Sequence, residues 1–519
     1  MTVRTAKIPI LMGPSPRGIS RLDRPRIRVT AADPESSPEP GAPATPMDSS
    51  CRVPEATDWF AACLLRSPTD RIGAVRLPWR NVRAGGLVAL VLVVVSSGCV
   101  GPVPPLQAPA DIGCDKADVP VTVTVSSQLD PACTYHRSFE ITASNVVLDC
   151  RGAHMELTDP ADQRGILIHA PSTVALSTVV VHNCDISGGV TNSIRVSRDG
   201  FKSLEAGHEY DAAFSNIVIE DSHLSGSKGS GIFVDGYVSG VTMQRVEIEG
   251  AGSVGIYLEA GSKDNVVDDN SIHGNGFGDV DPAGKPFSFG GTTFLYVSTG
   301  REGIAVDGSR SNRITRNRLS ANSAGGIFLY KNCGEHHTSQ PAQWWERRYG
   351  ADANLIEGNT VSGERNGVWI GSRMAENQYL MDCSDPKMVD GAYTAIHRDY
   401  ARDNIVRSNT FESVDNGVRI EDDRTTVEAN TFLSDDPADQ AIHLGTTYRP
   451  DYLGEPVADS VITANVATIT GNPEPYVLAH ADSNTTFEAN TSNGSPAGLR
   501  SGSQPDIDPF LFVRSFWLP

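Results

Sequence analysis

Short runs of alternating apolar and polar residues recur along the C-terminal two-thirds of the chain. The first clear run is GIFVDG from Gly231 and the last is AIHLGT from Ala441. An asparagine recurs at one place in the unit, at Asn270, Asn317, Asn359, Asn409, Asn430, Asn465 and Asn490. From Asn409 to Asn430 is 21 residues, the length of one uninterrupted unit. Two or three short strands in a unit of this length predict a solenoid, in which each unit buries its apolar face only against its neighbours.

The alternation also predicts which side chains face outward. In a strand successive side chains point to opposite sides, so Ile232 and Val234 should point inward and Phe233 and Asp235 outward. Stacked units then give one outward column of Phe233, Tyr257, Ala305, Phe328, Trp369, Arg419 and His443. A second column beside it contains Asp235, Glu259, Asp307, Tyr330, Gly371 and Glu421. The repeated asparagines should turn inward and hydrogen-bond neighbouring turns, which is a structural role.

Insertions lengthen the units in the middle of the repeat. They cover roughly residues 278–301, 332–352 and 374–402, and a smaller one covers 446–459. Insertions in repeat proteins become loops, often on the binding face. We therefore expect a groove over the coils that contain residues 304–308, 327–332 and 368–373.

The segment SFEITASNVVLDCRGAHM, from Ser138, and the units after it resemble right-handed parallel β-helix repeat proteins of the pectin-lyase-like class. This class includes NosD-like repeat proteins and polyuronate lyases and epimerases. The resemblance covers roughly residues 136–493, with a cap or tail at 494–519, and implies an all-β solenoid. The motifs of pectate lyases, polygalacturonases and alginate epimerases are absent, so no family residue is carried over, and this fold hosts many functions.

An export signal precedes the repeat. Residues 1–76 are polar and Pro-rich, typical of disorder, and are interpreted as a disordered or mis-annotated extension. The apolar run Leu87–Val95 is too short to span a bilayer but suits a signal peptide over 77–98. Small residues ending in Gly98-Cys99 resemble a bacterial lipobox, which implies acylation of Cys99 and a lipid-anchored protein of the cell envelope. An ordinary signal peptide with a chance cysteine is the alternative.

Six cysteines follow Cys99, and an even number in an exported protein indicates disulfides. Cys150 and Cys184 occupy nearly equivalent places in successive units and should stack and bond. Two further pairs are expected: Cys114–Cys133 in a tether and cap over 99–135, and Cys333–Cys383 between two long loops.

The net charge is −20, which argues against general binding of nucleic acid or anionic membranes. A polysaccharide is the expected partner of a monomeric chain, and no organic cofactor is expected. A polyanionic polysaccharide needs local positive charge, and the insertions supply it. Lys331 opens the loop KNCGEHHTSQPAQWWERRYG, which contains His336, His337, Trp344, Trp345, Arg347 and Arg348, and Arg373 ends a later strand.

These residues suggest uronate chemistry. A lyase or epimerase must neutralise the substrate carboxylate, remove the C5 proton and supply an acid. Lys331 or a loop histidine is the candidate base, Arg348 or Arg373 neutralises or donates, and Tyr330 relays. Arg419 lies in the same outward column as the groove residues and is a candidate for substrate binding.

Two sets of outward residues have competing interpretations. Phe328 and Trp369 either stack against sugars or are buried by the long loops. The stacked carboxylates Asp235, Glu259 and Asp307 are protonated, paired with Lys or Arg, or bridged by a cation such as Ca²⁺; a solvated acidic stripe is the alternative.

Two other functions stay open beside the lyase or epimerase. Asp307 with Glu421 or Asp422 would form an inverting glycoside hydrolase, which needs carboxyl groups about 6.5–9.5 Å apart. A non-catalytic surface protein that binds a polysaccharide, or supports another complex in the NosD manner, is the other alternative.

Overall fold

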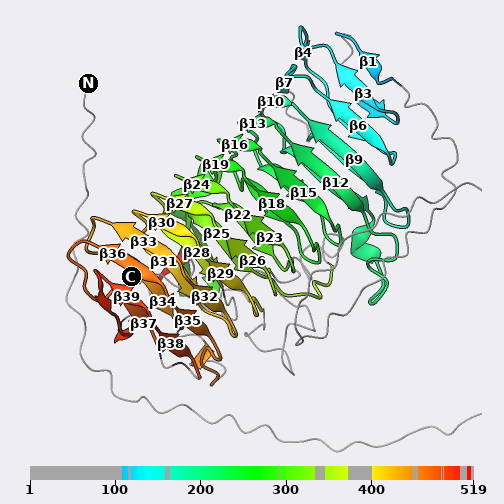
Figure 1. Ribbon diagram of the computed structural model, residues 1–519. Helices are drawn as coiled ribbons and strands as arrows, with labels where there is room; N and C mark the ends of the chain where they lie inside the picture. The colour runs from blue at the N-terminus through cyan, green and yellow to red at the C-terminus, as the bar shows by residue number, and fades with distance from the viewer. Residues whose placement is uncertain are drawn as a thin grey trace, which may run out of the picture. The chain divides into compact units, whose positions relative to one another are not determined.

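The computed structural model describes residues 108–114, 119–157, 164–289, 292–332, 345–371, 400–446, 449–450, 454–480, 482, 484–502 and 511–515. Within these residues the chain winds repeatedly through three sheets of 13 strands each, and successive coils add one parallel strand to each sheet. The exception is Ser495–Pro496, the last strand of its sheet, which pairs antiparallel with the strand just before it. Figure 1 shows the strands advancing in order from β1 to β38. No helix in the described part of the chain has the length and apolarity needed to cross a bilayer.

Sheet 1 contains β1 (Ala110–Ile112), β3 (Ser127–Leu129), β6 (Val146–Asp149), β9 (Ser177–His182), β12 (Ser215–Glu220), β15 (Val241–Gln244), β18 (Val266–Asp268), β23 (Arg313–Thr315), β26 (Leu355–Glu357), β29 (Ile405–Arg407), β32 (Thr426–Glu428), β35 (Val461–Thr463) and β38 (Thr486–Glu488). Sheet 2 contains β4 (Thr134–Tyr135), β7 (His154–Leu157), β10 (Asp185–Gly188), β13 (His223–Ser225), β16 (Glu247–Glu249), β19 (Ser271–His273), β24 (Arg318–Ser320), β27 (Thr360–Ser362), β30 (Thr410–Glu412), β33 (Thr431–Ser434), β36 (Val466–Ile469), β39 (Thr491–Ser492) and β40 (Ser495–Pro496). Sheet 3 contains β2 (Val121–Val123), β5 (Phe139–Ile141), β8 (Arg164–Pro171), β11 (Asn192–Asp199), β14 (Ser230–Val234), β17 (Ile256–Leu258), β22 (Glu302–Asp307), β25 (Gly325–Tyr330), β28 (Asn366–Ile370), β31 (Asn416–Ile420), β34 (Gln440–Leu444), β37 (Tyr476–Leu478) and β41 (Arg500–Ser501).

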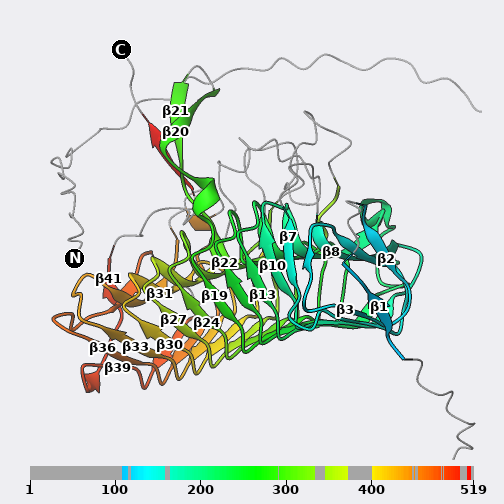
Figure 2. The ribbon, with the colours of Figure 1, turned by 90° about the horizontal axis from the view of Figure 1, so that it is seen from above.

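Three further strands form a separate antiparallel sheet. They are β20 (Val280–Phe289), β21 (Thr292–Thr299) and β42 (Leu511–Ser515), with β21 in the middle. Two short 3₁₀ helices, Phe201–Ser203 and Phe277–Asp279, lie in connections. Figure 2 shows β20 and β21 side by side. The insertion expected over residues 278–301 is therefore mainly a β-hairpin, which pairs with the C-terminal strand β42.

The core consists of stacked aliphatic side chains. Ile232 and Val234 of β14 are fully buried, and they align with Ile256 and Leu258 of the next coil. The same inward positions are filled in most coils by Ile, Val or Leu, which the two-residue period of the sequence predicts. The sheets already begin at β1, before residue 136, where the repeat was expected to start.

The repeated asparagines form a ladder at the turn between sheets 1 and 2. Asn359 accepts the backbone N–H of Asn317 at 2.9 Å and its side-chain N–H at 2.9 Å. It donates in turn to the carbonyl of Ile314 and to Asn409, both at 2.9 Å. The residue before each ladder asparagine adopts a left-handed φ, such as 57° at Arg316. The predicted structural role of these asparagines is confirmed, because their amides satisfy buried groups of the sharp turn.

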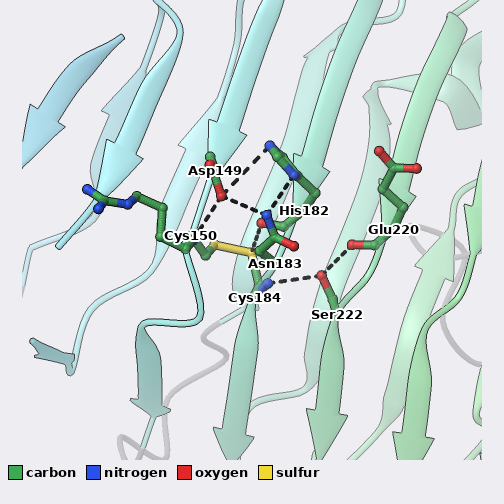
Figure 3. The surroundings of a disulfide bond; sticks show 8 residues. Asp149, Cys150, His182, Asn183, Cys184, Glu220 and Ser222 are labelled. Carbon is green, nitrogen blue, oxygen red and sulfur yellow. Dashed lines mark hydrogen bonds and ion pairs between the residues drawn. A yellow bond between two sulfur atoms is a disulfide. The ribbon is translucent and has the colours of Figure 1, made fainter. Parts of the chain in front are cut away.

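Two of the three expected disulfides lie within the described residues, and both are present. Cys114 bonds Cys133 across 19 residues, and Cys150 bonds Cys184 across 34. Figure 3 shows the second bond joining neighbouring coils, with Asp149 and His182 beside it. Cys99 and the pair Cys333–Cys383 lie outside the described residues.

Candidate functional site

The outward columns of sheet 3 have the register that the sequence predicts. Strand pairing aligns Phe233 with Tyr257, Tyr257 with Ala305, and Ala305 with Phe328. The same pairing continues from Phe328 through Trp369 and Arg419 to His443. The strands therefore place the predicted side chains in contact along one face of the sheet.

The aromatic rings of this column are covered by neighbouring protein groups. Phe328 and Trp369 are 0% and 1% exposed, and their rings meet edge to face at 5.6 Å. Phe233 and Tyr257 stack on each other at 4.8 Å with 3° between the planes, so each covers one face of the other. Burial of Phe328 and Trp369 is the second of the two alternatives that the sequence left open, and stacking of either ring on a sugar stays a prediction.

The carboxylates of the second column are each held by protein groups. Asp235 pairs with Arg195 at 2.7 Å, and Glu259 lies 3.7 Å from Arg347. Burial raises the pKa of Asp235 and, opposed by Arg347, raises that of Glu259 to about 7. The sequence left protonation, pairing with Lys or Arg, a bridging cation and a solvated stripe as alternatives. Asp235 and Glu259 each lie beside an arginine, as the pairing alternative states.

Asp307 is satisfied by hydrogen bonds. It accepts the Tyr257 hydroxyl at 2.6 Å, and the backbone and side-chain N–H groups of Asn332 at 2.6 and 2.8 Å. In the described chain, one group of three potential ligands has its atoms within 4.8 Å of one another, namely Cys114, Asp130 and Cys133. Its two sulfurs form a disulfide, so they do not fit a metal. The Ca²⁺ site at Asp235, Glu259 and Asp307 stays a prediction.

The acidic run at Glu421 is also neutralised within the protein. Arg419 bonds Glu421 at 2.5 Å, and both are 1% exposed. Arg449 pairs with Asp422 at 3.2 Å and with Asp423 at 2.7 Å. Arg419 is therefore neutralised by a neighbouring carboxylate, and its role in substrate binding stays a prediction. Asp307 and Glu421, the carboxylates of the hydrolase alternative, are both buried.

A basic cavity of about 370 Å³ lies where sheet 3 turns toward sheet 1. We call it the basic cavity and define it by its lining: Arg310, Ser311, Lys331, Arg347, Arg348, Tyr349, Gly350, Asp352, Ala353, Tyr400 and Arg402. Arg310 and Ser311 follow β22, and Lys331 follows β25. The other lining residues belong to segments 345–353 and 400–402. Among the described lining residues, five are cationic and one is a carboxylate, in a chain whose net charge is −20.

Two arginines of the basic cavity are placed on tyrosine rings. The guanidinium of Arg310 lies 4.2 Å from the ring centroid of Tyr349, and that of Arg402 lies 3.8 Å from that of Tyr400. Among the described residues, neither guanidinium has a carboxylate within 4.0 Å, and the buried Nε of each has no hydrogen-bond partner. Both arginines are half-buried, Arg310 also hydrogen-bonds Tyr210, and the Asp352 carboxylate attracts Arg402 electrostatically. Two guanidinium groups that line one cavity and make no ion pair among the described residues favour an anionic ligand.

The other cations of the basic cavity have protein partners. Arg348 bonds Glu209 and Glu346, both at 3.0 Å, and so fastens segment 345–350 to the connection that follows β11. Arg347 contacts Glu259 and lies 5.0 Å from the Trp345 ring. Lys331 forms part of the wall and is 6% exposed.

Of the predicted residues that the structure describes, Lys331, Arg347 and Arg348 line the basic cavity. Tyr330 is fully buried, donates to Glu302 at 2.9 Å and accepts from Arg301 at 2.9 Å, and its role as a relay stays a prediction. Trp345 is 4% exposed and packs on Phe201. His336, His337, Trp344 and Arg373 lie outside the described residues.

Sequence reasoning missed Arg310, Tyr349, Asp352, Tyr400 and Arg402. A signal was present in the repeat, because Arg310, Asp352 and Arg402 each stand two residues before an asparagine of a second ladder, at Asn312, Asn354 and Asn404. Aligning the units on that asparagine would have placed the three side chains in one column.

A second cavity, of about 570 Å³, lies beside the Cys150–Cys184 disulfide. Its charged lining is mixed, and its groups pair with one another. Asp185 lies between His154 at 2.7 Å and His223 at 2.9 Å, and Arg245 bonds Asp221 at 2.7 Å. Neighbouring side chains of this corner appear in Figure 3. Because opposite charges already meet here, this cavity is a weaker candidate than the basic cavity.

Stacked parallel sheets, a ladder of asparagines and a cavity at a sheet turn define a right-handed parallel β-helix protein. Residues 164–340 match the family model described as a right-handed β-helix region. The predicted fold class, an all-β solenoid of this kind, is confirmed. A comparison with curated proteins found no match.

Several solved structures are similar to this chain. The A-module of the mannuronan C-5 epimerase AlgE4 from Azotobacter vinelandii is 11% identical, with a TM-score of 0.40, covering 74% of this chain and 91% of the module. An alginate lyase from Paenibacillus sp. str. FPU-7 is 12% identical, with a TM-score of 0.35, covering 74% and 99%. A mutant tailspike protein of E. coli bacteriophage HK620, in complex with a pentasaccharide, is 14% identical, with a TM-score of 0.35, covering 72% and 60%. These similarities do not assign an activity to this chain.

Proposed function

We propose that this protein is an exported, carbohydrate-active β-helix protein that takes a uronic-acid polysaccharide into the basic cavity and acts on it as a lyase or C5-epimerase. The observation that carries the proposal is the pair Arg310 and Arg402, whose guanidinium groups have no carboxylate partner among the described residues. Export, and acylation of Cys99 at the cell envelope, rest on the sequence up to Cys99 alone.

The geometry of the basic cavity suits a carboxylate ligand. Guanidinium groups bind carboxylates through two parallel hydrogen bonds, and such charge-assisted bonds are stronger than neutral ones. Tyr349 and Tyr400 hold the two guanidinium groups from one side, which reduces the conformational entropy lost on binding. A chain of net charge −20 repels polyanions elsewhere, so the site concentrates its positive charge locally.

The same residues supply the requirements of uronate chemistry. An arginine that neutralises the substrate carboxylate makes the C5 proton more acidic, and Lys331 in the cavity wall is the candidate base. In a lyase, loss of that proton is accompanied by cleavage of the C4–O bond, and the departing oxygen receives a proton. In an epimerase an acid on the opposite face supplies a proton to C5, so the configuration is inverted. Lysine has an ordinary pKa of about 10.4, which must fall for Lys331 to act as a base. Neighbouring positive charges favour the neutral form of a lysine, whereas a neighbouring carboxylate opposes it.

Binding without catalysis is the second candidate function, and one observation favours it. Two of the four predicted catalytic residues are engaged in the protein: Tyr330 with Glu302 and Arg301, and Arg348 with Glu209 and Glu346. A cavity whose remaining cations only hold an anionic sugar would serve a surface protein that binds a polysaccharide.

A product assay tests the catalytic proposal. The purified protein would be incubated with alginate, pectate, glucuronan and glycosaminoglycans, following the ultraviolet absorbance of unsaturated uronates and, by NMR, the C5 configuration. We expect Arg402→Gln and Lys331→Ala to abolish product formation, and Arg313→Gln, an exposed position on the same coil as Arg310, to leave it unchanged. Full activity of Lys331→Ala would remove the base assignment. Absence of any product, with binding retained, would establish the non-catalytic alternative.

A further inference from the structure

Three charged residues of the basic cavity occupy equivalent positions in successive coils. The N–H of Ser311 bonds the carbonyl of Asp352 at 3.0 Å, and the N–H of Ala353 bonds the carbonyl of Arg402 at 2.9 Å. Ser311 and Ala353 both adopt a left-handed φ, of 56° and 57°, which confirms that the turns are equivalent. Arg310, Asp352 and Arg402 therefore form one column along the solenoid, and all three line the cavity.

The charge alternates along this column from positive to negative to positive. Adjacent coils are about 4.8 Å apart, so the anchor points of Arg310 and Arg402 are separated by about 10 Å, with Asp352 midway. The Asp352 side chain is fixed, because its Oδ1 accepts the backbone N–H of Arg402 at 2.8 Å. An extended polysaccharide advances by roughly one coil spacing per sugar, so successive sugars would meet successive members of the column.

We infer that the basic cavity selects a polysaccharide in which anionic and uncharged sugars alternate, with one carboxylate at Arg310, the next at Arg402, and an uncharged sugar against Asp352. This inference rests on the proposed anionic-polysaccharide function and specifies the class of substrate. It follows from the charge pattern, because a polymer with a carboxylate on every sugar would place one of them against Asp352.

Like charges in a partly enclosed site repel each other more strongly than in water. A homopolymeric uronate must therefore lose affinity at the middle position, or leave that position unfilled. An uncharged sugar has no such cost, and its hydroxyl groups can donate hydrogen bonds to the Asp352 carboxylate. Asp352 is thus a specificity-determining residue that acts by disfavouring one class of polymer.

The test compares oligosaccharides of equal length by isothermal titration calorimetry at constant ionic strength. Hexasaccharides of hyaluronan and heparosan, in which glucuronate alternates with an uncharged sugar, would be compared with hexasaccharides of mannuronate and galacturonate. We expect the alternating oligomers to bind the purified protein at least tenfold more tightly. Asp352→Asn, which can still accept the Arg402 N–H, should raise the affinity for the homopolymers about tenfold and leave the alternating oligomers nearly unchanged.

The control is Asp403→Asn, which removes the same charge one residue beyond Arg402, where Asp403 is exposed and pairs with Arg424 at 2.6 Å. It should change neither affinity. Equal binding of both classes, or a homopolymer affinity that Asp352→Asn does not raise, would overturn the inference while leaving anionic binding intact. If neither class binds, the anionic-polysaccharide function itself is wrong, and this inference with it.

Discussion

Glu364 should make the free energy of unfolding depend on pH. It is a buried carboxylate at the end of a row of hydrogen-bonded side chains that runs from Asn275 through Asn322 to Glu364. Its Oε1 accepts the backbone and side-chain N–H groups of Asn322 at 3.1 and 2.8 Å, and its Oε2 is buried without a hydrogen-bond partner. The residue is 2% exposed, and burial, opposed by the bonds from Asn322, raises its pKa to about 7. The folded state therefore holds this proton more tightly than the unfolded chain does.

The sign and size of the effect follow. A carboxyl whose folded pKa is raised contributes stability that is fully present below the unfolded value of 4.5 and is lost as the pH rises toward 7. One pKa unit corresponds to about 1.4 kcal/mol, so the loss approaches about 3 kcal/mol. Glu364→Gln keeps the acceptor for Asn322 and removes the charge. Near pH 8 it should be more stable than the natural protein by up to that amount, and near pH 4 the two should agree.

Urea unfolding followed by circular dichroism at pH 4 to 8 measures this difference. Glu412→Gln is the control, since Glu412 is exposed on the neighbouring strand β30, and its pH profile should match that of the natural protein. Glu259 and Asp422, whose pKa values burial also raises to about 7, affect both proteins equally and cancel in the difference. Parallel pH profiles for Glu364→Gln and the natural protein would refute the reasoning.

Three further predictions concern the solenoid. Asn359→Ala should cost about 2–4 kcal/mol in urea unfolding, because four hydrogen bonds of a residue that is 1% exposed are lost; a cost below 0.5 kcal/mol would contradict the ladder's role. Replacing both Cys150 and Cys184 by Ala should lower the free energy of unfolding by about 3 kcal/mol and lower the melting temperature. Reductant should then lower the melting temperature of this variant less than that of the natural protein. An unchanged melting temperature would argue against the bond. Arg348→Ala should destabilise by about 3 kcal/mol, because it leaves Glu209, 2% exposed, without its cation; the further variant Glu209→Gln should recover part of the loss, and no recovery would contradict the pairing.

The fold could be predicted from the sequence because its determinants are local and repeat. The alternation at Ile232 to Asp235 fixes which side chains face inward, and each recurring asparagine marks the same turn, so the register of sheet 3 follows by counting. The stacked cysteines Cys150 and Cys184 follow from the same counting. Insertions do not repeat, and the hairpin of β20 and β21, which pairs with β42 far along the chain, has no such signal.

The candidate site was predictable only in part. The concentration of basic residues near Lys331, Arg347 and Arg348 is visible in the sequence, and all three line the cavity. Whether a side chain is buried or paired within the protein, and so is not open to a ligand, depends on partners distant in sequence. Arg348 pairs with Glu209, which is 139 residues away, and Trp369 and Phe328 are covered rather than open. Arg310 and Arg402 were not predicted, because insertions separate their coils in the sequence and the two side chains form one column only when the turns stack.

The central claim is that Arg310 and Arg402 bind an anionic sugar in the basic cavity, and one binding measurement tests it most directly. Calorimetric titration of a glucuronate-containing hexasaccharide would be run with the natural protein, Arg310→Gln, Arg402→Gln and the control Arg313→Gln, at low and at physiological salt. A hydrogen bond to a charged group contributes about 1.5–3 kcal/mol, so each cavity variant should bind at least tenfold more weakly. The control should match the natural protein, and salt should weaken binding least in the cavity variants. Unchanged affinity in both cavity variants would contradict the account.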